Sequence, residues 1–274
     1  MKGGKRPLGY TIVEVMIVLA VSGMMFVIAA YFINGRQAEA QFNQGLHDFA
    51  SRLQGNIQEV IDGEYPGTST INCTAAAGLP ITITNAGNGQ GTNGSCVFLG
   101  KVIELSVSGN PKNYAVISVA GNRLLANSQP ATTLYTSNPA AVDGTPNITD
   151  LETIPQDQSV SGIKIIDANG GSCTTCYAFG FFTTPPTDSS GALSGGSQTM
   201  NLYELNSVTS AFTEQQTSQA IQNTTSVSVP QASSVTICFD NGGQRQGTVV
   251  IGTNNNQLNV EVNRVNWSGP SPCS

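Results

Sequence analysis

The sequence predicts an α+β protein: one long N-terminal helix, with a membrane half and an amphipathic half, packed on an antiparallel β-sheet body with disulfides. Three observations carry this prediction. Residues 10–33 form an apolar run with a single acidic residue, residues 34–62 continue it with a helical period, and residues 64–274 change to short β-rich runs separated by Gly, Asn, Ser and Thr. A helical segment followed by a series of strands is typical of the α+β class.

The apolar run is long enough to cross a bilayer. It holds 24 residues, and a membrane-spanning helix needs about 20 predominantly apolar residues. Lys2, Lys5 and Arg6 precede the run, and basic residues favour the cytoplasmic side of a membrane. We therefore expect residues 1–9 to form a cytoplasmic leader and the chain after residue 33 to lie outside, as in a single-pass membrane protein.

Glu14 is the one acidic residue within this apolar run. A carboxylate in the hydrocarbon region costs about 2.5–3.5 kcal/mol on insertion scales, and it usually has a partner. If the chain is cut after Gly9, the new α-amine of Tyr10 lies one helical turn from Glu14. A neighbouring subunit, shifted along the helix axis, could present that amine more easily than the same chain. The alternative is a simple membrane anchor with a protonated Glu14.

Residues 9–20 read GYTIVEVMIVLA and are followed by Gly23. This segment resembles the prepilin signal of type IV pilins and of the pseudopilins of type II secretion. The resemblance implies that a prepilin peptidase cleaves after Gly9 and methylates the amine of Tyr10. It also implies that Glu14 serves assembly, by pairing with the N-terminus of a neighbouring subunit, and that the fold is pilin-like.

Two departures from the family pattern refine this expectation. Tyr10 replaces the usual Phe, and Tyr31 stands where many major pilins have a helix-kinking Pro. The second departure favours a minor pilin or a pseudopilin. The resemblance then implies a subunit of a type IV pilus or a secretion pseudopilus, whose partners are other pilins, the inner-membrane assembly platform and, before assembly, the lipid bilayer.

The second half of the predicted helix is amphipathic, because apolar residues recur every three or four positions: Ala38, Phe42, Leu46, Phe49, Leu53, Ile57 and Ile61. This period predicts one helical face that packs on a globular body. We expect a bend at Asn34-Gly35 and an end at Gly63 and Pro66. From residue 10 to residue 62 the helix would be about 80 Å long, at 1.5 Å per residue.

Residues 64–274 are expected to form an extracellular, mainly β domain. Runs rich in β-branched and aromatic residues predict strands at 80–84, 96–107, 114–120, 162–167, 177–183, 200–205, 235–239, 248–251 and 258–265. Turn-forming residues predict loops at 85–94, 127–146 and 185–198. Residues 210–223 are expected to form a short helix.

The C-terminal strands carry a second resemblance. Residues 235–245 read VTICFDNGGQR and precede two more predicted strands. This pattern is similar to the last strands of the GspH/FimT-like branch of pseudopilins and minor pilins. Members of that branch that bind DNA use basic residues near this end, so the resemblance implies Arg245 and Arg264 as possible DNA contacts.

The chain has six cysteines, at 73, 96, 173, 176, 238 and 273. An even number outside the cytoplasm favours disulfides, although six cysteines allow 15 connectivities. We favour pairing between sequence neighbours: Cys73 with Cys96, Cys173 with Cys176, and Cys238 with Cys273. A zinc site at Cys173 and Cys176 would need two further ligands, and the chain has a single histidine, His47. A thioredoxin-like role lacks the required βαβ context.

Charge and composition argue against several functions. The net charge is −6, and removal of residues 1–9 leaves 8 basic residues against 17 acidic ones, or −9. Nucleic-acid binding is disfavoured because it usually needs clustered Lys and Arg. One histidine and no phosphate-binding loop argue against an enzyme, a metal or a cofactor. The alternative to a purely structural subunit is a pilus-tip module whose polar loops bind DNA, a surface or a partner cell.

Overall fold

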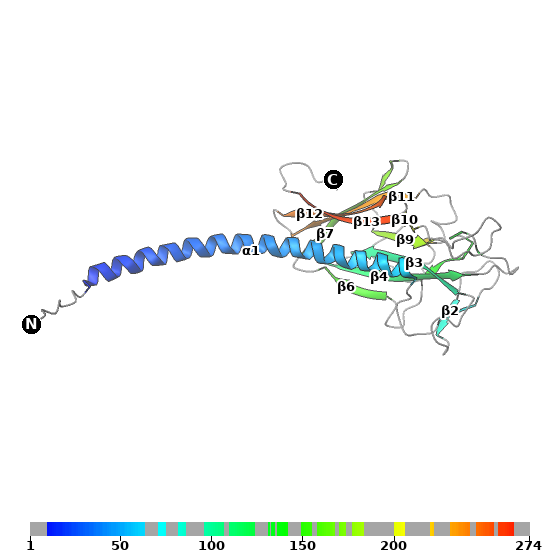
Figure 1. The fold of residues 1–274 in the computed structure, drawn as a ribbon, viewed down its shortest axis with the longest axis horizontal. Helices are drawn as coiled ribbons and strands as arrows, with labels where there is room; N and C mark the ends of the chain where they lie inside the picture. The colour runs from blue at the N-terminus through cyan, green and yellow to red at the C-terminus, as the bar shows by residue number, and fades with distance from the viewer. Residues whose placement is uncertain are drawn as a thin grey trace, which may run out of the picture.

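The computed structural model describes residues 10–63, 71–74, 82–85, 96–106, 110–123, 131, 133–134, 136–141, 149–154, 158–167, 170–173, 177–183, 200–205, 220–221, 231–241, 245–254 and 257–265. Figure 1 shows one long helix with its N-terminal half projecting away from a body of strands, which gather around the C-terminal half of the helix. The molecule therefore has two parts, a bare rod and a β body, joined by one helix.

The helix α1 runs without interruption over Ile12–Asp62, a length of 51 residues. It passes through the predicted bend at Asn34-Gly35 as a helix and curves gently along its length (Figure 1). It ends at Gly63, which has a left-handed φ of 65° and whose N–H donates to the carbonyl of Val60 at 3.2 Å. Glycine adopts this conformation without strain, so the predicted stop at Gly63 is confirmed.

The first sheet is antiparallel and has the strand order β10-β9-β3-β4-β5, with β6 also paired to β4. Its strands are β3 (Cys96–Leu105), β4 (Asn113–Asn122), β5 (Ala140–Ala141), β6 (Thr149–Thr153), β9 (Ala178–Thr183) and β10 (Met200–Glu204). The long strands β3 and β4 form its centre.

The second sheet is also antiparallel, with the order β13-β12-β11-β7-β8. Its strands are β7 (Ser159–Asp167), β8 (Ser172–Cys173), β11 (Ala232–Asp240), β12 (Gln246–Asn254) and β13 (Gln257–Val265). A separate antiparallel pair consists of β1 (Ile71–Thr74) and β2 (Thr82–Asn85). One helix on antiparallel sheets confirms the predicted α+β class.

The main hydrophobic core lies between the second half of α1 and one face of each sheet. The helix contributes seven buried side chains, those of Phe42, Leu46, Phe49, Ala50, Leu53, Ile57 and Val60. The predicted stripe is confirmed from Phe42 to Ile57, whereas Ala38, at its start, is half-buried. It is wrong at its end, because Ile61 is 47% exposed and Val60 is buried. Because the helix has 3.6 residues per turn, a strict spacing of four residues drifts off the buried face. Val60, three positions after Ile57, therefore takes the buried place that the pattern gives to Ile61.

The helix lies very close to β12 at Gly247. A β-carbon at this position would lie 2.3 Å from Cδ1 of Leu46. Real side chains essentially never approach so closely, and Leu46 is buried in the core. A glycine at 247 therefore allows the helix to seat on the second sheet.

A second, smaller core covers the opposite face of the first sheet. Adjacent residues of β3 show the division, because Ile103 belongs to the main core and Val102 to the second one. This alternation follows from the period of two along a strand. Leu134, Leu205 and Ile221 also belong to the second core, so segments between the strands cover the face of the sheet that the helix does not.

All nine predicted strands are present, with shifted ends. Four observed strands, β1, β5, β6 and β8, were not predicted, and β5 lies inside the predicted loop 127–146, which is wrong at residues 140–141. These strands have two to five residues, too few to show a clear alternation of apolar and polar side chains. Of the predicted helix 210–223, only residues 220 and 221 are described, and both are helical. The predicted loop 185–198 lies outside the described residues.

Candidate functional site

The most unusual surface of the protein is the bare N-terminal half of α1. Its large apolar side chains are exposed from Tyr10 to Tyr31, with Ile12 at 81% and Phe26 at 77% of their full area. Within the described residues, α1 is the one helix that is long and apolar enough to cross a membrane, judged by length and composition. Exposed apolar surface of this extent marks contact with lipid or with other protein chains.

Thr11 begins this helix and fixes the backbone around Glu14. Thr11 has an extended conformation, and its Oγ1 accepts a hydrogen bond from the N–H of Glu14 at 3.3 Å. Its carbonyl accepts from the N–H groups of Glu14 and Val15 at 3.1 and 3.2 Å. Thr11 was not among the predicted site residues, although a Thr three positions before a Glu is the sequence signature of a helix N-terminus.

Glu14 lies in the first turn of the helix, where a negative charge is favoured by the helix dipole. Its neighbours on the helix, Val13 and Val15, are exposed and apolar. Among the described residues, no side chain forms an ion pair or a hydrogen bond with its carboxylate. The Tyr10 side chain is 83% exposed, and Gly9 lies outside the described residues. The predicted cleavage, methylation and pairing therefore stay predictions.

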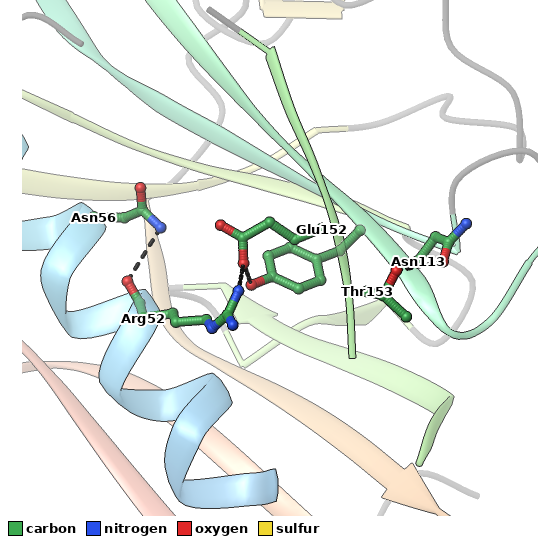
Figure 2. A network of polar contacts seen from close by, with 6 residues as sticks. Arg52, Asn56, Asn113, Glu152 and Thr153 are labelled. Atoms are coloured by element: carbon green, nitrogen blue, oxygen red, sulfur yellow. Dashed lines mark hydrogen bonds and ion pairs between the residues drawn. The ribbon is translucent and has the colours of Figure 1, made fainter. Parts of the chain in front are cut away.

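Two polar contacts attach the second half of the helix to the first sheet. In the first, Arg52 forms an ion pair with Glu152 on β6, and the Tyr114 hydroxyl donates to the same carboxylate oxygen. Figure 2 shows Arg52 and Glu152 pointing toward one another from the helix and the strand. Burial and the neighbouring carboxylate raise the pKa of Tyr114, and the bond to Glu152 raises the pKa of Arg52. The carboxylate thus ties a helix residue to a core tyrosine.

The second contact lies one turn further along the helix. Lys101 on β3 is buried, with 4% of its side chain exposed, and its Nζ forms an ion pair with Glu59 and donates to Oδ1 of Asn56 at 2.6 Å. An ammonium buried at such an interface is tolerated because charged and polar partners replace its water.

The two possible DNA contacts lie at the same end of the second sheet. Arg245 is half-buried just before β12, and its N–H donates to Oδ1 of Asn241 at 3.3 Å. Arg264 pairs through its backbone with Gly247 at the same end of the sheet, and its side chain lies outside the described residues. Lys164, another basic residue of this sheet, lies in the middle of β7 opposite Thr236.

Cys238 is buried on β11 and takes part in a disulfide. Its predicted partner, Cys273, lies outside the described residues, as does Cys176, the predicted partner of Cys173. Cys73 on β1 and Cys96 on β3 belong to two strands that contact each other. The side chains of both lie outside the described residues, so the three pairings stay predictions.

A metal site needs several ligating side chains close together. No group of three or more His, Cys, Asp or Glu side chains that could hold a metal ion occurs in the described part of the chain. His47 lies on the exposed side of the helix, between the buried Leu46 and the half-buried Asp48.

The described residues thus define an α+β protein with one exposed apolar helix and an antiparallel β body. Comparison of the chain with protein-family models, with curated proteins and with solved structures found no match. The function must therefore be argued from the residues of the chain itself.

Proposed function

We propose that this chain is a minor pilin or pseudopilin, a subunit that is anchored in the membrane by residues 10–33 and later assembles through the same segment into a type IV pilus or a secretion pseudopilus. The observation that carries the proposal is the difference in exposure between the two halves of α1. Its first half is apolar and exposed, and its second half packs on the β body. A helix built in this way keeps its apolar half available for lipid first and for other subunits afterwards.

The position of Glu14 supports assembly over simple anchoring. An unpaired carboxylate in the hydrocarbon region costs about 2.5–3.5 kcal/mol, and a membrane anchor alone gains nothing from it. Exchange of lipid for a neighbouring subunit whose N-terminal amine lies at the same depth would offset this cost. The charge at position 14 then favours the filament over the membrane.

Processing by a prepilin peptidase would supply that amine. Cleavage after Gly9 removes Lys2, Lys5 and Arg6 and makes Tyr10 the N-terminus, directly before the helix cap at Thr11. The remaining partners in this proposal are other pilins and the inner-membrane assembly platform, and the β body lies outside the cell membrane.

The test is the N-terminus of the protein extracted from membranes. Mass spectrometry should find Tyr10 as the first residue and a methyl group on its amine. An intact Met1, or a cut beyond residue 33, would exclude the prepilin interpretation.

The second test is assembly of a Glu14→Gln variant, which loses the charge but keeps the size of the side chain. We expect normal cleavage and membrane insertion and a loss of incorporation into sheared filaments. Asp62→Asn is the matched control, because it removes a carboxylate from the exposed far end of the same helix. Equal incorporation of both variants would reject the pairing of Glu14.

A further inference from the structure

The contact between Lys101, Asn56 and Glu59 contains the reactants of an amide condensation. The Lys101 amine is a nucleophile when it is deprotonated, the Asn56 side chain is a carboxamide, and the Glu59 carboxylate can accept and return a proton. The amine lies 2.6 Å from Oδ1 of Asn56 and forms an ion pair with Glu59. An ion pair alone would account for Lys101 and Glu59, but it does not require a carboxamide on the same amine.

Local structure brings the three groups together. Asn56 and Glu59 are three residues apart on α1, so they share one face of the helix. Lys101 follows directly after a β-bulge between Phe98 and Gly100. The bulge requires glycine, because Gly100 has a φ of 156° and a β-carbon there would lie 2.1 Å from the carbonyl oxygen of Phe181. After the bulge the pairing is regular, and Lys101 lies on the same face of β3 as Ile103, which packs in the core under the helix.

We propose that Lys101 and Asn56 condense into an intramolecular amide bond, with Glu59 as the proton carrier, and that this bond joins α1 covalently to β3. The Lys101 Nζ attacks Cγ of Asn56 and forms the new C–N bond, and the bond from Cγ to Nδ2 breaks. Glu59 takes a proton from the Lys101 ammonium, which frees the amine for the attack, and later accepts the second proton of Nζ. Both protons pass to Nδ2, which leaves as an ammonium ion. The step needs no oxidant, reductant or further reactant, and Glu59 ends in its starting state.

Proximity is the main physical reason why this reaction can occur. Well-oriented intramolecular reactions reach effective molarities of about 10⁵–10⁸ M, and a positioned acid or base adds about 10²–10⁴-fold. The attack needs Nζ as a free amine, and this form arises when Glu59 takes a proton across the ion pair. The bond has to form only once in the lifetime of a chain, so a slow rate is sufficient.

The orientation of Asn56 also suits the reaction. Its Nδ2 donates to the carbonyl of Arg52 at 3.1 Å, whereas its Oδ1 accepts from Lys101 (Figure 2 shows the first of these bonds). The carboxamide is therefore held from both sides. The neighbouring contact between Arg52 and Glu152 cannot react in the same way, because a guanidinium is not deprotonated in proteins and is no nucleophile.

The experiment is peptide mapping of the full chain purified from membranes. Digestion followed by mass spectrometry should give one linked peptide that joins Lys101 to Asn56 and lacks one ammonia. The linked peptide is the readout, because an Asn-Gly succinimide, for example at residues 93–94, also loses ammonia. Separate peptides of Lys101 and Asn56, with no linked form in the folded protein, would overturn the proposal without any variant.

Three variants identify the roles of the residues. Lys101→Arg keeps the positive charge but cannot condense, so the linked peptide should be absent. Glu59→Gln should reduce its yield at a fixed early time after synthesis at least about tenfold, because the loss of a general acid and base slows the reaction. Glu152→Gln is the matched control, because it breaks the other polar contact of the helix and should leave the yield unchanged. An undiminished yield in Glu59→Gln would remove Glu59 from the reaction.

Discussion

Arg52 on the helix and Tyr114 in the core meet on one carboxylate oxygen, that of Glu152. Arg52 is 51% exposed and Glu152 is 24% exposed, whereas Tyr114 is buried. The carboxylate therefore connects the surface of the helix to a strand of the first sheet. Exposed ion pairs contribute about 0–1 kcal/mol, but a charged acceptor for a buried hydroxyl contributes about 1.5–3 kcal/mol.

We therefore expect the two partners of this contact to differ in their effect on stability. Glu152→Ala should lower the free energy of unfolding by about 1.5–3 kcal/mol, because it leaves the Tyr114 hydroxyl without its acceptor. Arg52→Ala should lower it by at most about 1 kcal/mol. Urea unfolding of both variants measures the difference. Equal losses would mean that Tyr114 gains little from the carboxylate.

The same contact predicts a dependence on alkaline pH. Burial and the Glu152 carboxylate raise the pKa of Tyr114 in the folded state, so the unfolded chain loses this proton first. The contribution of Tyr114 to stability is complete below about pH 10, the value for an unperturbed tyrosine. It is lost as the pH rises through the folded-state value. Raising the pH from 9 to 11 should therefore lower the free energy of unfolding of the wild type more than that of Tyr114→Phe. Urea unfolding at several pH values measures this, and equal pH dependence of the two proteins would contradict the assignment.

Gly247 should tolerate no side chain. Gly247→Ala would place a methyl group against the buried Leu46, so overpacking should cost about 1–3 kcal/mol of unfolding free energy. Gly252 on the same strand is the control, because a β-carbon there meets nothing within 4 Å. Gly252→Ala should change stability by less than about 0.5 kcal/mol. Similar losses at both positions would show that the effect comes from strand propensity and not from the packing of the helix against β12.

The disulfide at Cys238 should stabilise the body. Cys238→Ser should cost about 2–5 kcal/mol, because it removes a native crosslink from a buried strand. Peptide mapping without reduction should find Cys273 as its partner, no free thiol and no zinc. A linkage of Cys238 to any other cysteine would show that pairing by sequence neighbours fails in this chain.

DNA binding should be weak. After removal of residues 1–9 the chain carries a charge of −9, so little counterion release is available. We expect a fragment that starts at Gln37 to bind duplex DNA no tighter than about 10⁻⁴ M at physiological salt. Titration of labelled DNA at two salt concentrations measures this. Micromolar binding with a steep salt dependence, lost in Arg245→Ala, would instead favour a pilus-tip module that binds DNA.

The long elements of the fold were predictable from the sequence, because their periods are strong. The apolar stripe from Phe42 to Ile57 fixed the buried face of the helix, and the alternation of Leu258, Val260 and Val262 with polar residues marked β13. Strands such as β5, with two alanines, have no period of their own and form because a longer neighbour offers unpaired backbone groups. Their pairing is tertiary and leaves no local signal.

The site residues also differ in how far the sequence identifies them. Glu14 was identified because a carboxylate in an apolar run is exceptional, whereas Asn56, Glu59 and Lys101 have ordinary neighbours in the sequence. Lys101 lies 45 residues from Asn56, and it faces the helix because it shares one side of β3 with Ile103. Such a contact follows from the register of two strands and cannot be deduced from the composition of either segment.

The unbroken course of α1 has a mechanical consequence. No flexible linker separates the exposed apolar half from the half that the β body holds, so the two halves turn together. A change of one residue in the packing of the apolar half would rotate its facing side by about 100°, and the body would follow by the same angle. In any bundle of such helices, the direction in which the β body faces is therefore set by the side chains of the apolar half, which the body does not contact.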